Sequence, residues 1–126
     1  AFTAPDMTAY PFATKNKKDF YNLLEVYLDA TFFPLLEELD FLQEGWRYDL
    51  EESGTEPKFL YQGVVFNEMK GAMSSPNSQL WQHLHSSLFP DTNYRFNSGG
   101  DPVEIPNLTY AQLKSFHKKY YYLIGC

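Results

Sequence analysis

The sequence has a single cysteine and few basic residues. Cys126 stands at the very end, so no internal disulfide can form, and three scattered histidines cannot complete the four ligands of a closed structural zinc site. Ten lysines and arginines stand against sixteen acidic residues, which gives a net charge of −6. Nucleic acids are bound through basic side chains that release counterions, so this charge disfavours a nucleic-acid partner.

Long apolar runs and the common catalytic motifs are missing as well. No stretch approaches the roughly 18 apolar residues that span a bilayer, and no basic-then-apolar leader opens the chain. No membrane partner is therefore expected. The sequence holds no Walker loop, dinucleotide fingerprint, C-x-x-C or Ser-His-Asp arrangement. Taken alone, its residues give weak support for catalysis.

Apolar and aromatic side chains are abundant. The 126 residues are 44% hydrophobic and 18% aromatic, which is too much for a disordered chain and suits one domain with one core. The chain begins with Ala1 rather than Met, and its first residues are already strand-like. We therefore expect a processed, truncated or excised product.

Strand and helix patterns alternate along the chain and predict an α+β fold. The first twelve residues predict a hairpin around a turn at Pro5-Asp6, and Trp46 begins a passage into a strand. The capping residues Asn16 and Thr109 each precede a helical pattern, and Pro34 should end the first of these helices. Helices are predicted at residues 16–33, 35–43, 63–73, 80–88 and 109–120, with loops at 52–57 and 91–106.

The last predicted helix carries an apolar stripe that should be buried. Its members recur at helical spacing and are Tyr110, Leu113, Phe116, His117 and Tyr120.

Glu68 has the most unusual surroundings of any charged residue. In the helix predicted at this point, two valines lie one turn before it, and Gly71 and Ala72 lie one turn after it. A buried carboxylate is costly unless a metal or a cation compensates its charge. Glu68 is therefore a candidate metal ligand. The pattern leaves open an ion pair with Lys70 or Arg47, or a position that faces solvent.

The remaining polar patterns favour structural roles. His83 and His85 lie roughly 200° apart around a helix and cannot chelate one ion together. His117 lies on the apolar side of its helix and is interpreted as a satisfied core histidine. The segment Ser98-Gly99-Gly100-Asp101 lacks the lysine and the helix of a phosphate loop. The acidic run at residues 37–44 is typical of a solvated helix face.

Several segments resemble the presequence protease family. The segment Gly63-Val-Val-Phe-Asn-Glu-Met-Lys-Gly71 looks like the part of that family that carries its distal zinc-ligand glutamate. The resemblance covers about residues 1–121, and it ends where Tyr122-Leu-Ile-Gly-Cys126 replaces the turn and returning strand of the family. Further similar segments are Ala1-Phe-Thr3, Tyr10-Pro-Phe12, Lys18-Asp-Phe-Tyr-Asn-Leu-Leu24, Val26-Tyr-Leu-Asp-Ala30, Phe33-Pro34, Gln43-Glu-Gly-Trp-Arg47, Ser98-Gly-Gly-Asp-Pro102 and Phe116-His117.

The resemblance implies a zinc metalloendopeptidase of the pitrilysin-like, inverted-zincin group. In that group an H-x-x-E-H helix supplies two zinc-binding histidines and a glutamate base, and a distant glutamate completes the site. Glu68 matches this distant ligand of Zn²⁺. No H-x-x-E-H occurs in the 126 residues, so the chain is expected to hold one of three zinc ligands and no catalytic residue, and to be inactive alone.

The resemblance also implies a substrate and a location. Ala1, Phe2 and Thr3 look like the end of an edge strand on which the family binds peptides by strand addition, although an ordinary edge strand would show the same pattern. The implied substrates are short unstructured peptides, including cleaved mitochondrial presequences. The implied location is the mitochondrial matrix, or the cytoplasm for a bacterial protein.

The implied fold is an incomplete α-β roll, in which an antiparallel sheet packs against helices. Residues 1–126 would form part of an N-terminal catalytic-type domain that lacks its first and last strands. Helices such as the one at residues 20–31 should then expose apolar faces, and the isolated chain should be marginally stable and bind apolar dyes.

Two other readings remain open. The chain could be a non-catalytic product that binds peptides, or that associates with the rest of the protease or with a related subunit. Alternatively, it has no function of its own and is a gene-model or degradation fragment.

Overall fold

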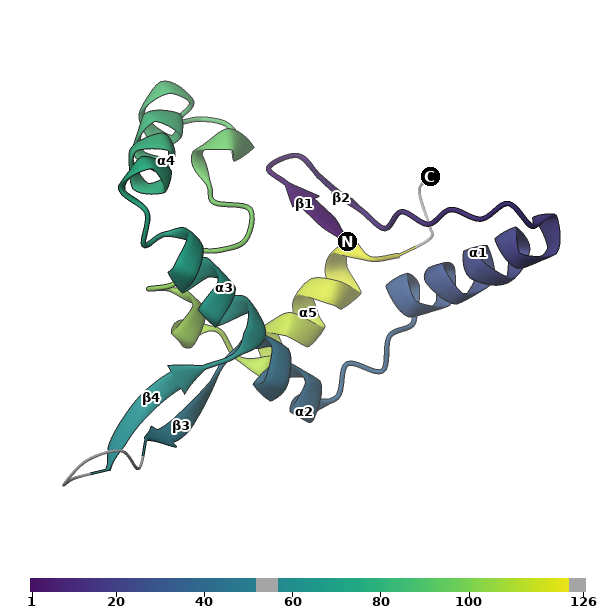
Figure 1. Ribbon diagram of the computed structural model, residues 1–126, viewed down its shortest axis with the longest axis horizontal. Helices are drawn as coiled ribbons and strands as arrows, with labels where there is room; N and C mark the ends of the chain where they lie inside the picture. Colours follow the sequence, from purple (N-terminus) through teal and green to yellow (C-terminus); the bar gives the residue numbers. More distant parts are fainter. Residues whose placement is uncertain (52–56, 123–126) are drawn as a thin grey trace.

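The structure is a computed structural model that describes residues 1–51 and 57–122. Short antiparallel hairpins alternate with helices, which confirms the predicted α+β class. The elements, in chain order, are β1 (Phe2–Ala4), β2 (Met7–Ala9), α1 (Lys17–Phe32), α2 (Glu38–Asp40), the π-helix η1 (Phe41–Gly45), β3 (Arg47–Glu51), β4 (Lys58–Gln62), α3 (Val64–Ala72), α4 (Pro76–Leu88), the 3₁₀-helices η2 (Asn93–Arg95) and η3 (Ile105–Asn107), and α5 (Tyr110–Tyr120). Figure 1 shows α1, α4 and the hairpin β3–β4 extending in three directions from a central region.

Each of the two hairpins joins strands that are neighbours in the sequence. β1 pairs with β2, with Thr3 opposite Thr8, around the turn predicted at Pro5-Asp6. β3 pairs with β4, a strand that sequence analysis did not predict, with Tyr48 opposite Tyr61. Side chains alternate between the two faces of a strand. One face of β3–β4 is therefore aromatic and apolar, and the other is mainly charged and polar.

The helix ends follow the predicted capping residues. The Asn16 side chain accepts hydrogen bonds from two backbone N–H groups in the first turn of α1, and α1 ends two residues before Pro34. Thr109 and Gln112 form the predicted capping box of α5. α4 begins with Pro76, which confirms the predicted break after α3.

The helix predicted at residues 35–43 is wrong at both ends. The helical segment begins three residues later, with α2, because Leu36 adopts a left-handed φ of 45° and Glu37 donates its backbone N–H to the Asp40 carboxylate. The second half of the segment is a π-helix that continues to Gly45. A leucine in the left-handed region costs about 1–2 kcal/mol, and the apolar spacing of a sequence does not reveal such a turn.

Few side chains are buried. Phe66 and Ile105 are the only buried hydrophobic residues in the described part of the chain. No member of the predicted buried stripe of α5 is fully buried, and Phe116 and Tyr120 are each 56% exposed. α5 has no extensive contact with another described element, so this side of the helix meets solvent. The expectation that residues 20–31 expose an apolar face is confirmed, since α1 buries no side chain.

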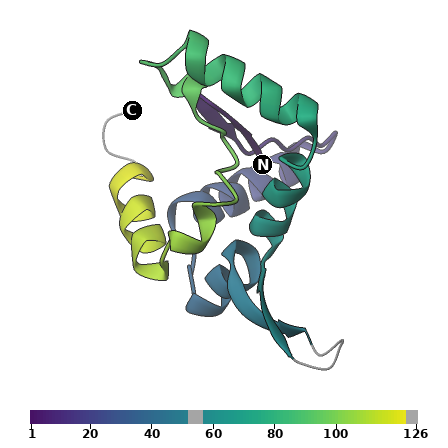
Figure 2. The ribbon, with the colours of Figure 1, turned by 90° about the vertical axis from the view of Figure 1, so that its left-hand side faces the viewer.

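Single polar contacts join segments that are far apart in the sequence. The Tyr110 hydroxyl donates a 2.6 Å hydrogen bond to the carbonyl oxygen of Leu36 and so ties α5 to the turn before α2. The Tyr94 hydroxyl donates a 3.0 Å hydrogen bond to the Asp6 carboxylate, and this bond raises the pKa of Tyr94. In Figures 1 and 2 the segment after α4 accordingly folds back toward the β1–β2 hairpin.

Breaking the contact between Tyr10 and Tyr121 is expected to shift the alkaline titration of the chain. The two hydroxyl oxygens lie 3.3 Å apart, and this hydrogen bond, together with partial burial, raises the pKa of Tyr10 from 10.0 to about 12. A raised pKa means that the folded state favours the protonated hydroxyl. The contact therefore stabilises the fold below about pH 10, and this stabilisation is lost as the pH rises toward about 12.

Tyrosinate absorbance measures this effect. The titration curve of Tyr10 is obtained by subtracting the curve of the Tyr10→Phe variant from the curve of the unsubstituted chain. When the same subtraction is made in the presence of Tyr121→Phe, we expect the pKa of Tyr10 to fall toward the ordinary tyrosine value of 10.0. Tyr21→Phe, which removes an exposed tyrosine of α1, serves as the control. A difference curve that Tyr121→Phe leaves in place would contradict the assignment.

Some predictions fall on residues outside the described ranges. The loop predicted at residues 52–57 lies outside them except for Pro57, and the divergent C-terminal segment lies outside them except for Tyr122. Cys126 belongs to that segment. Within residues 1–51 and 57–122, no helix has both the length and the apolar character needed to cross a bilayer.

Candidate functional site

Glu68 lies in the middle of α3, the helix that begins directly after Gly63. Successive helical residues are about 100° apart, so Glu68 lies on the face opposite Phe66, the side chain that α3 buries. Val64 and Gly71 share the outward face with Glu68, and all three are exposed. The predicted stripe of small and apolar residues around the carboxylate therefore faces solvent in this chain.

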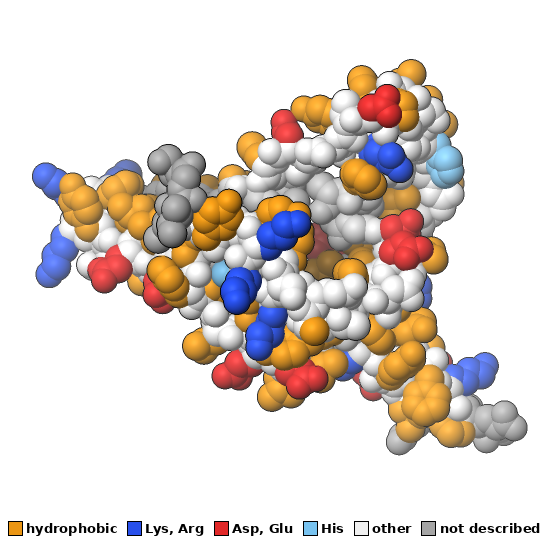
Figure 3. Space-filling view, turned by 180° about the vertical axis from the view of Figure 1, so that it is seen from behind, with side chains coloured by type: hydrophobic (Ala, Val, Ile, Leu, Met, Phe, Trp, Pro, Cys, Tyr) orange, Lys and Arg blue, Asp and Glu red, His pale blue; other side chains and the backbone are white. Residues whose placement is uncertain are grey.

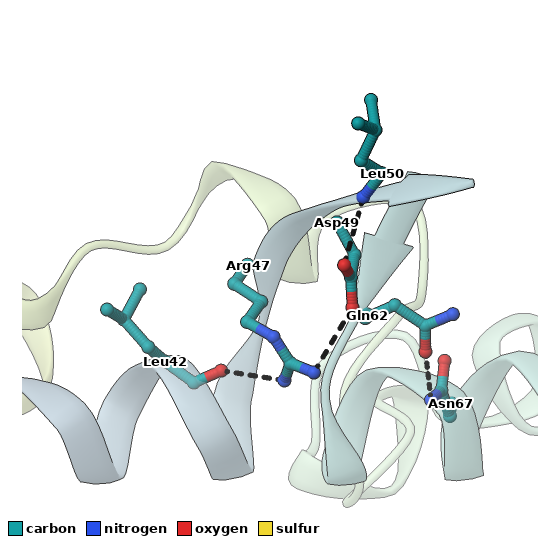
Figure 4. A network of polar contacts seen from close by, with 6 residues as sticks. All are labelled: Leu42, Arg47, Asp49, Leu50, Gln62 and Asn67. Carbon is teal, nitrogen blue, oxygen red and sulfur yellow. Dashed lines mark hydrogen bonds and ion pairs between the residues drawn. The ribbon is translucent and has the colours of Figure 1, made fainter. Parts of the chain in front are cut away.

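Two side-chain contacts fix the N-terminal half of α3. The Phe66 ring packs edge-on against the Tyr61 ring, with ring centres 5.8 Å apart. The side-chain amide of Asn67 donates a 2.8 Å hydrogen bond to the side-chain oxygen of Gln62, the last residue of β4 (Figure 4). The strand that sequence analysis missed thus holds the helix that carries Glu68.

Two glycines allow other segments to approach α3 closely. A Cβ atom on Gly63 would overlap the carbonyl oxygen of Gly45, so the backbone before α3 touches the backbone at the end of η1. A Cβ atom on Gly99 would overlap the side chain of Met69. Met69 follows Glu68 directly, so the loop that contains Gly99 packs against α3 next to the residue that carries the carboxylate. Neither contact could be predicted, because each pairs residues from separate segments.

The cations considered as partners of Glu68 are engaged elsewhere. Arg47 donates a 3.3 Å hydrogen bond to a carbonyl oxygen of η1 and lies 3.4 Å from an Asp49 carboxylate oxygen (Figure 4). The Lys70 ammonium lies 5.9 Å from the centre of the Phe66 ring. Arg47 and Asp49 form the one ion pair of the described residues. The ion-pair alternative for Glu68 is not realised there, and the solvent-facing alternative is.

Two of the three histidines contact a backbone carbonyl oxygen. His83 and His85 both lie in α4, so their side chains point in nearly opposite directions around a helix and cannot bind one ion together. His83 Nδ1 lies 2.7 Å from the carbonyl oxygen of Gln79. His117 is half-buried, and its Nε2 lies 2.9 Å from the carbonyl oxygen of Thr31, which joins α5 to α1. Sequence analysis interprets His117 as a satisfied core histidine: its hydrogen bond is present, but the side chain is only half-buried and is not part of the core.

The described residues contain no converging group of three or more His, Cys, Asp or Glu side chains. Glu68 nevertheless fits a metal as a single ligand, since carboxylate oxygens bind zinc and its side chain is exposed. Its neighbours Gly71 and Ala72 are small and also exposed, which leaves room for other side chains to reach it. Glu68 and its neighbours can therefore supply one metal ligand, the Glu68 carboxylate.

The proposed peptide edge is short and open. Ala1, Phe2 and Thr3 are exposed, and β1 pairs only with β2 among the described strands, so its other edge has no strand partner there. The Ser98 hydroxyl donates a 3.4 Å hydrogen bond to the carbonyl oxygen of Thr3. The loop that contacts Met69 through Gly99 thus also touches this edge.

The described residues form an α+β segment with one exposed carboxylate on α3, that of Glu68, and one open strand edge on β1. No protein-family model matches the chain. The mitochondrial presequence protease of Danio rerio is 56% identical over 124 residues, which are 97% of this chain and 12% of the relative.

Other relatives match over the same extent. Presequence protease 1 of Arabidopsis thaliana, named chloroplastic/mitochondrial, is 50% identical over 97% of this chain and 11% of its own length. Protein HypA of Clostridium perfringens is 54% identical over 97% of this chain and 12% of its own length. The chain is homologous to a segment of the presequence proteases, and it spans about 12% of the length of these relatives.

Proposed function

We propose that the chain is the segment of a zinc metalloendopeptidase that carries the distal zinc-ligand glutamate, Glu68. The observation that carries the proposal is the identity of 50–56% to presequence proteases across 97% of the chain. The position of Glu68 supports it, because an exposed carboxylate among small residues can be reached by ligands from other segments. The substrates would be short unstructured peptides such as cleaved presequences.

The roles of the residues follow from this proposal. Zinc, when bound, would lower the pKa of a bound water and polarise the scissile carbonyl. Glu68 would hold one position of the metal, and the histidine ligands and general base would come from outside these 126 residues. The β1 edge at Ala1, Phe2 and Thr3 would bind the peptide backbone through main-chain hydrogen bonds, which suit many sequences. The word mitochondrial in the relatives' names supports a mitochondrial location, which we place in the matrix, and the clostridial relative would allow a bacterial cytoplasm.

A chimeric protease tests this function. In the Danio rerio relative, the 124 matching residues would be replaced by this chain. We expect the chimera to fold, bind zinc and cleave unstructured peptides at a rate within about tenfold of the parent, because the segment would restore the missing ligand. The isolated chain should cleave nothing. A folded chimera without peptidase activity would contradict the proposal, and so would activity of the isolated chain that survives chelation.

A second candidate, a non-catalytic interaction module, is favoured by the exposed apolar faces of α1 and α5. It predicts that the isolated chain binds a peptide or a subunit even though the chimera has no activity.

A further inference from the structure

An apolar cleft of about 660 Å³ opens where η1, η3 and α5 meet. The indole N–H of Trp46 donates a 2.8 Å hydrogen bond to the carbonyl oxygen of Leu108, and both residues line the cleft. The rest of the lining includes the hydrophobic residues Leu36, Phe41, Val65, Ile105, Leu113 and Phe116. Val65 lies on α3, one turn before Glu68, so the cleft adjoins the helix of the proposed metal ligand.

The chain also exposes far more surface than a compact protein of its size. Its accessible surface is 10322 Å². A compact folded monomer of 14.7 kDa exposes about 6,900 Å², so the excess is about 3,400 Å². Figure 3 shows hydrophobic side chains on all three arms of the molecule. An exposed apolar surface of this extent is typical of a protein interface.

The size of the excess accessible surface indicates what kind of partner could cover it. A standard interface covers about 800 Å² on each partner, and a large obligate interface covers up to about 2,500 Å². One contact with a second copy of this chain would leave much of the excess uncovered. The chain spans about 12% of its relatives, so a much larger body of protein is available in a molecule of that kind.

We infer that the cleft is a docking site for an apolar segment from the remaining part of a presequence-protease-type chain. This inference rests on the proposed function. Phe116 is the anchor of the site, since it lines the cleft from α5 and is 56% exposed in the isolated chain. Docking of the segment beside Val65 would connect the rest of the protease to α3 and Glu68.

The charges of the cleft specify the docked segment further. Asp40 and Glu44 also line the cleft. The one ion pair of the described residues involves neither of them, and their carboxylates accept hydrogen bonds only from neighbours in the chain, Glu37 and Gln43. The docked segment should therefore present apolar side chains to the cleft and a lysine or arginine to these two carboxylates.

The test compares Phe116→Ser in the isolated chain and in the chimera described above. Lys118→Ser is the matched control, because Lys118 is exposed on the same helix but does not line the cleft. In the chimera we expect Phe116→Ser to lower the melting temperature by at least about 4 °C more than Lys118→Ser, because it would empty a filled cleft. In the isolated chain the two variants should have similar helical circular dichroism.

A second measurement does not depend on stability. Phe116→Cys should react quickly with a bulky maleimide in the isolated chain and at least about tenfold more slowly in the chimera, whereas Lys118→Cys should react quickly in both. Peptide mass spectrometry assigns the labelled residue. Equal labelling of both positions in a folded chimera, or equal melting temperatures, would overturn the inference.

The remaining outcomes separate the two proposals. An isolated chain that sediments as a dimer and becomes monomeric with Phe116→Ser would show that a second copy occupies the cleft, and would overturn the inference. A folded chimera that protects Phe116→Cys but lacks peptidase activity would support the docking site and reject the proposed function.

Discussion

Glu68→Gln is expected to remove zinc and nearly all peptide cleavage from the chimeric protease without unfolding it. Glutamine keeps the size of the side chain but is neutral, and its amide oxygen is a weaker zinc ligand than a carboxylate oxygen. Glu68 is exposed, opposite the buried Phe66, and has no ion-pair partner among the described residues, so the substitution breaks no contact shown there. The fold of the segment should therefore persist.

The expected loss is large because the metal supplies several kcal/mol of transition-state stabilisation. We expect kcat/KM to fall by about 10³-fold or more, and the bound zinc to fall well below one equivalent. Peptide-cleavage kinetics and metal analysis of the purified protein measure the two quantities. Glu25→Gln, at another exposed helical glutamate, is the matched control and should leave both near the parent value.

Retention of both zinc and turnover in Glu68→Gln would remove Glu68 from the ligand set. A loss of zinc with a lowered melting temperature would instead assign the residue a structural role. The two results are distinguished by measuring unfolding together with metal content.

Gly63→Ala is expected to be the most destabilising small substitution in the chain. The added Cβ would overlap the carbonyl oxygen of Gly45 and lie 2.8 Å from the Cα of Trp46, and both are backbone atoms that cannot rotate away. Overpacking of this kind costs about 1–3 kcal/mol, and we expect the upper end of that range. The contact joins the start of α3 to η1, so its loss should also displace Glu68.

Gly71→Ala is the matched control for this prediction. Gly71 lies inside α3, where a Cβ would meet no described atom within 4 Å. Alanine at this position should raise helix stability by about 0.5–1 kcal/mol, because it restricts the unfolded chain and favours the helix. Urea unfolding followed by circular dichroism at 222 nm measures both variants. Equal midpoints for Gly63→Ala and Gly71→Ala would show that the close approach is not maintained in solution.

Local signals in the sequence determined where several elements begin or end. Asn16 and Thr109 cap their helices, Pro34 follows the end of α1, and Pro5 lies in the first turn. These features depend on a few neighbouring residues, since a cap or a proline acts on backbone groups within one turn. For the same reason sequence analysis placed Glu68 correctly within a helix among small residues.

The structure decided everything that depends on residues far apart in the chain. It showed that β4 exists and pairs with β3, that Gly63 touches Gly45, and that Met69 packs against Gly99. It also placed Phe116 in an open cleft, although its helical spacing had predicted burial. Amphipathic spacing identifies the face of a helix that can be buried, but burial itself requires another segment to cover that face, and only the tertiary arrangement supplies or withholds it.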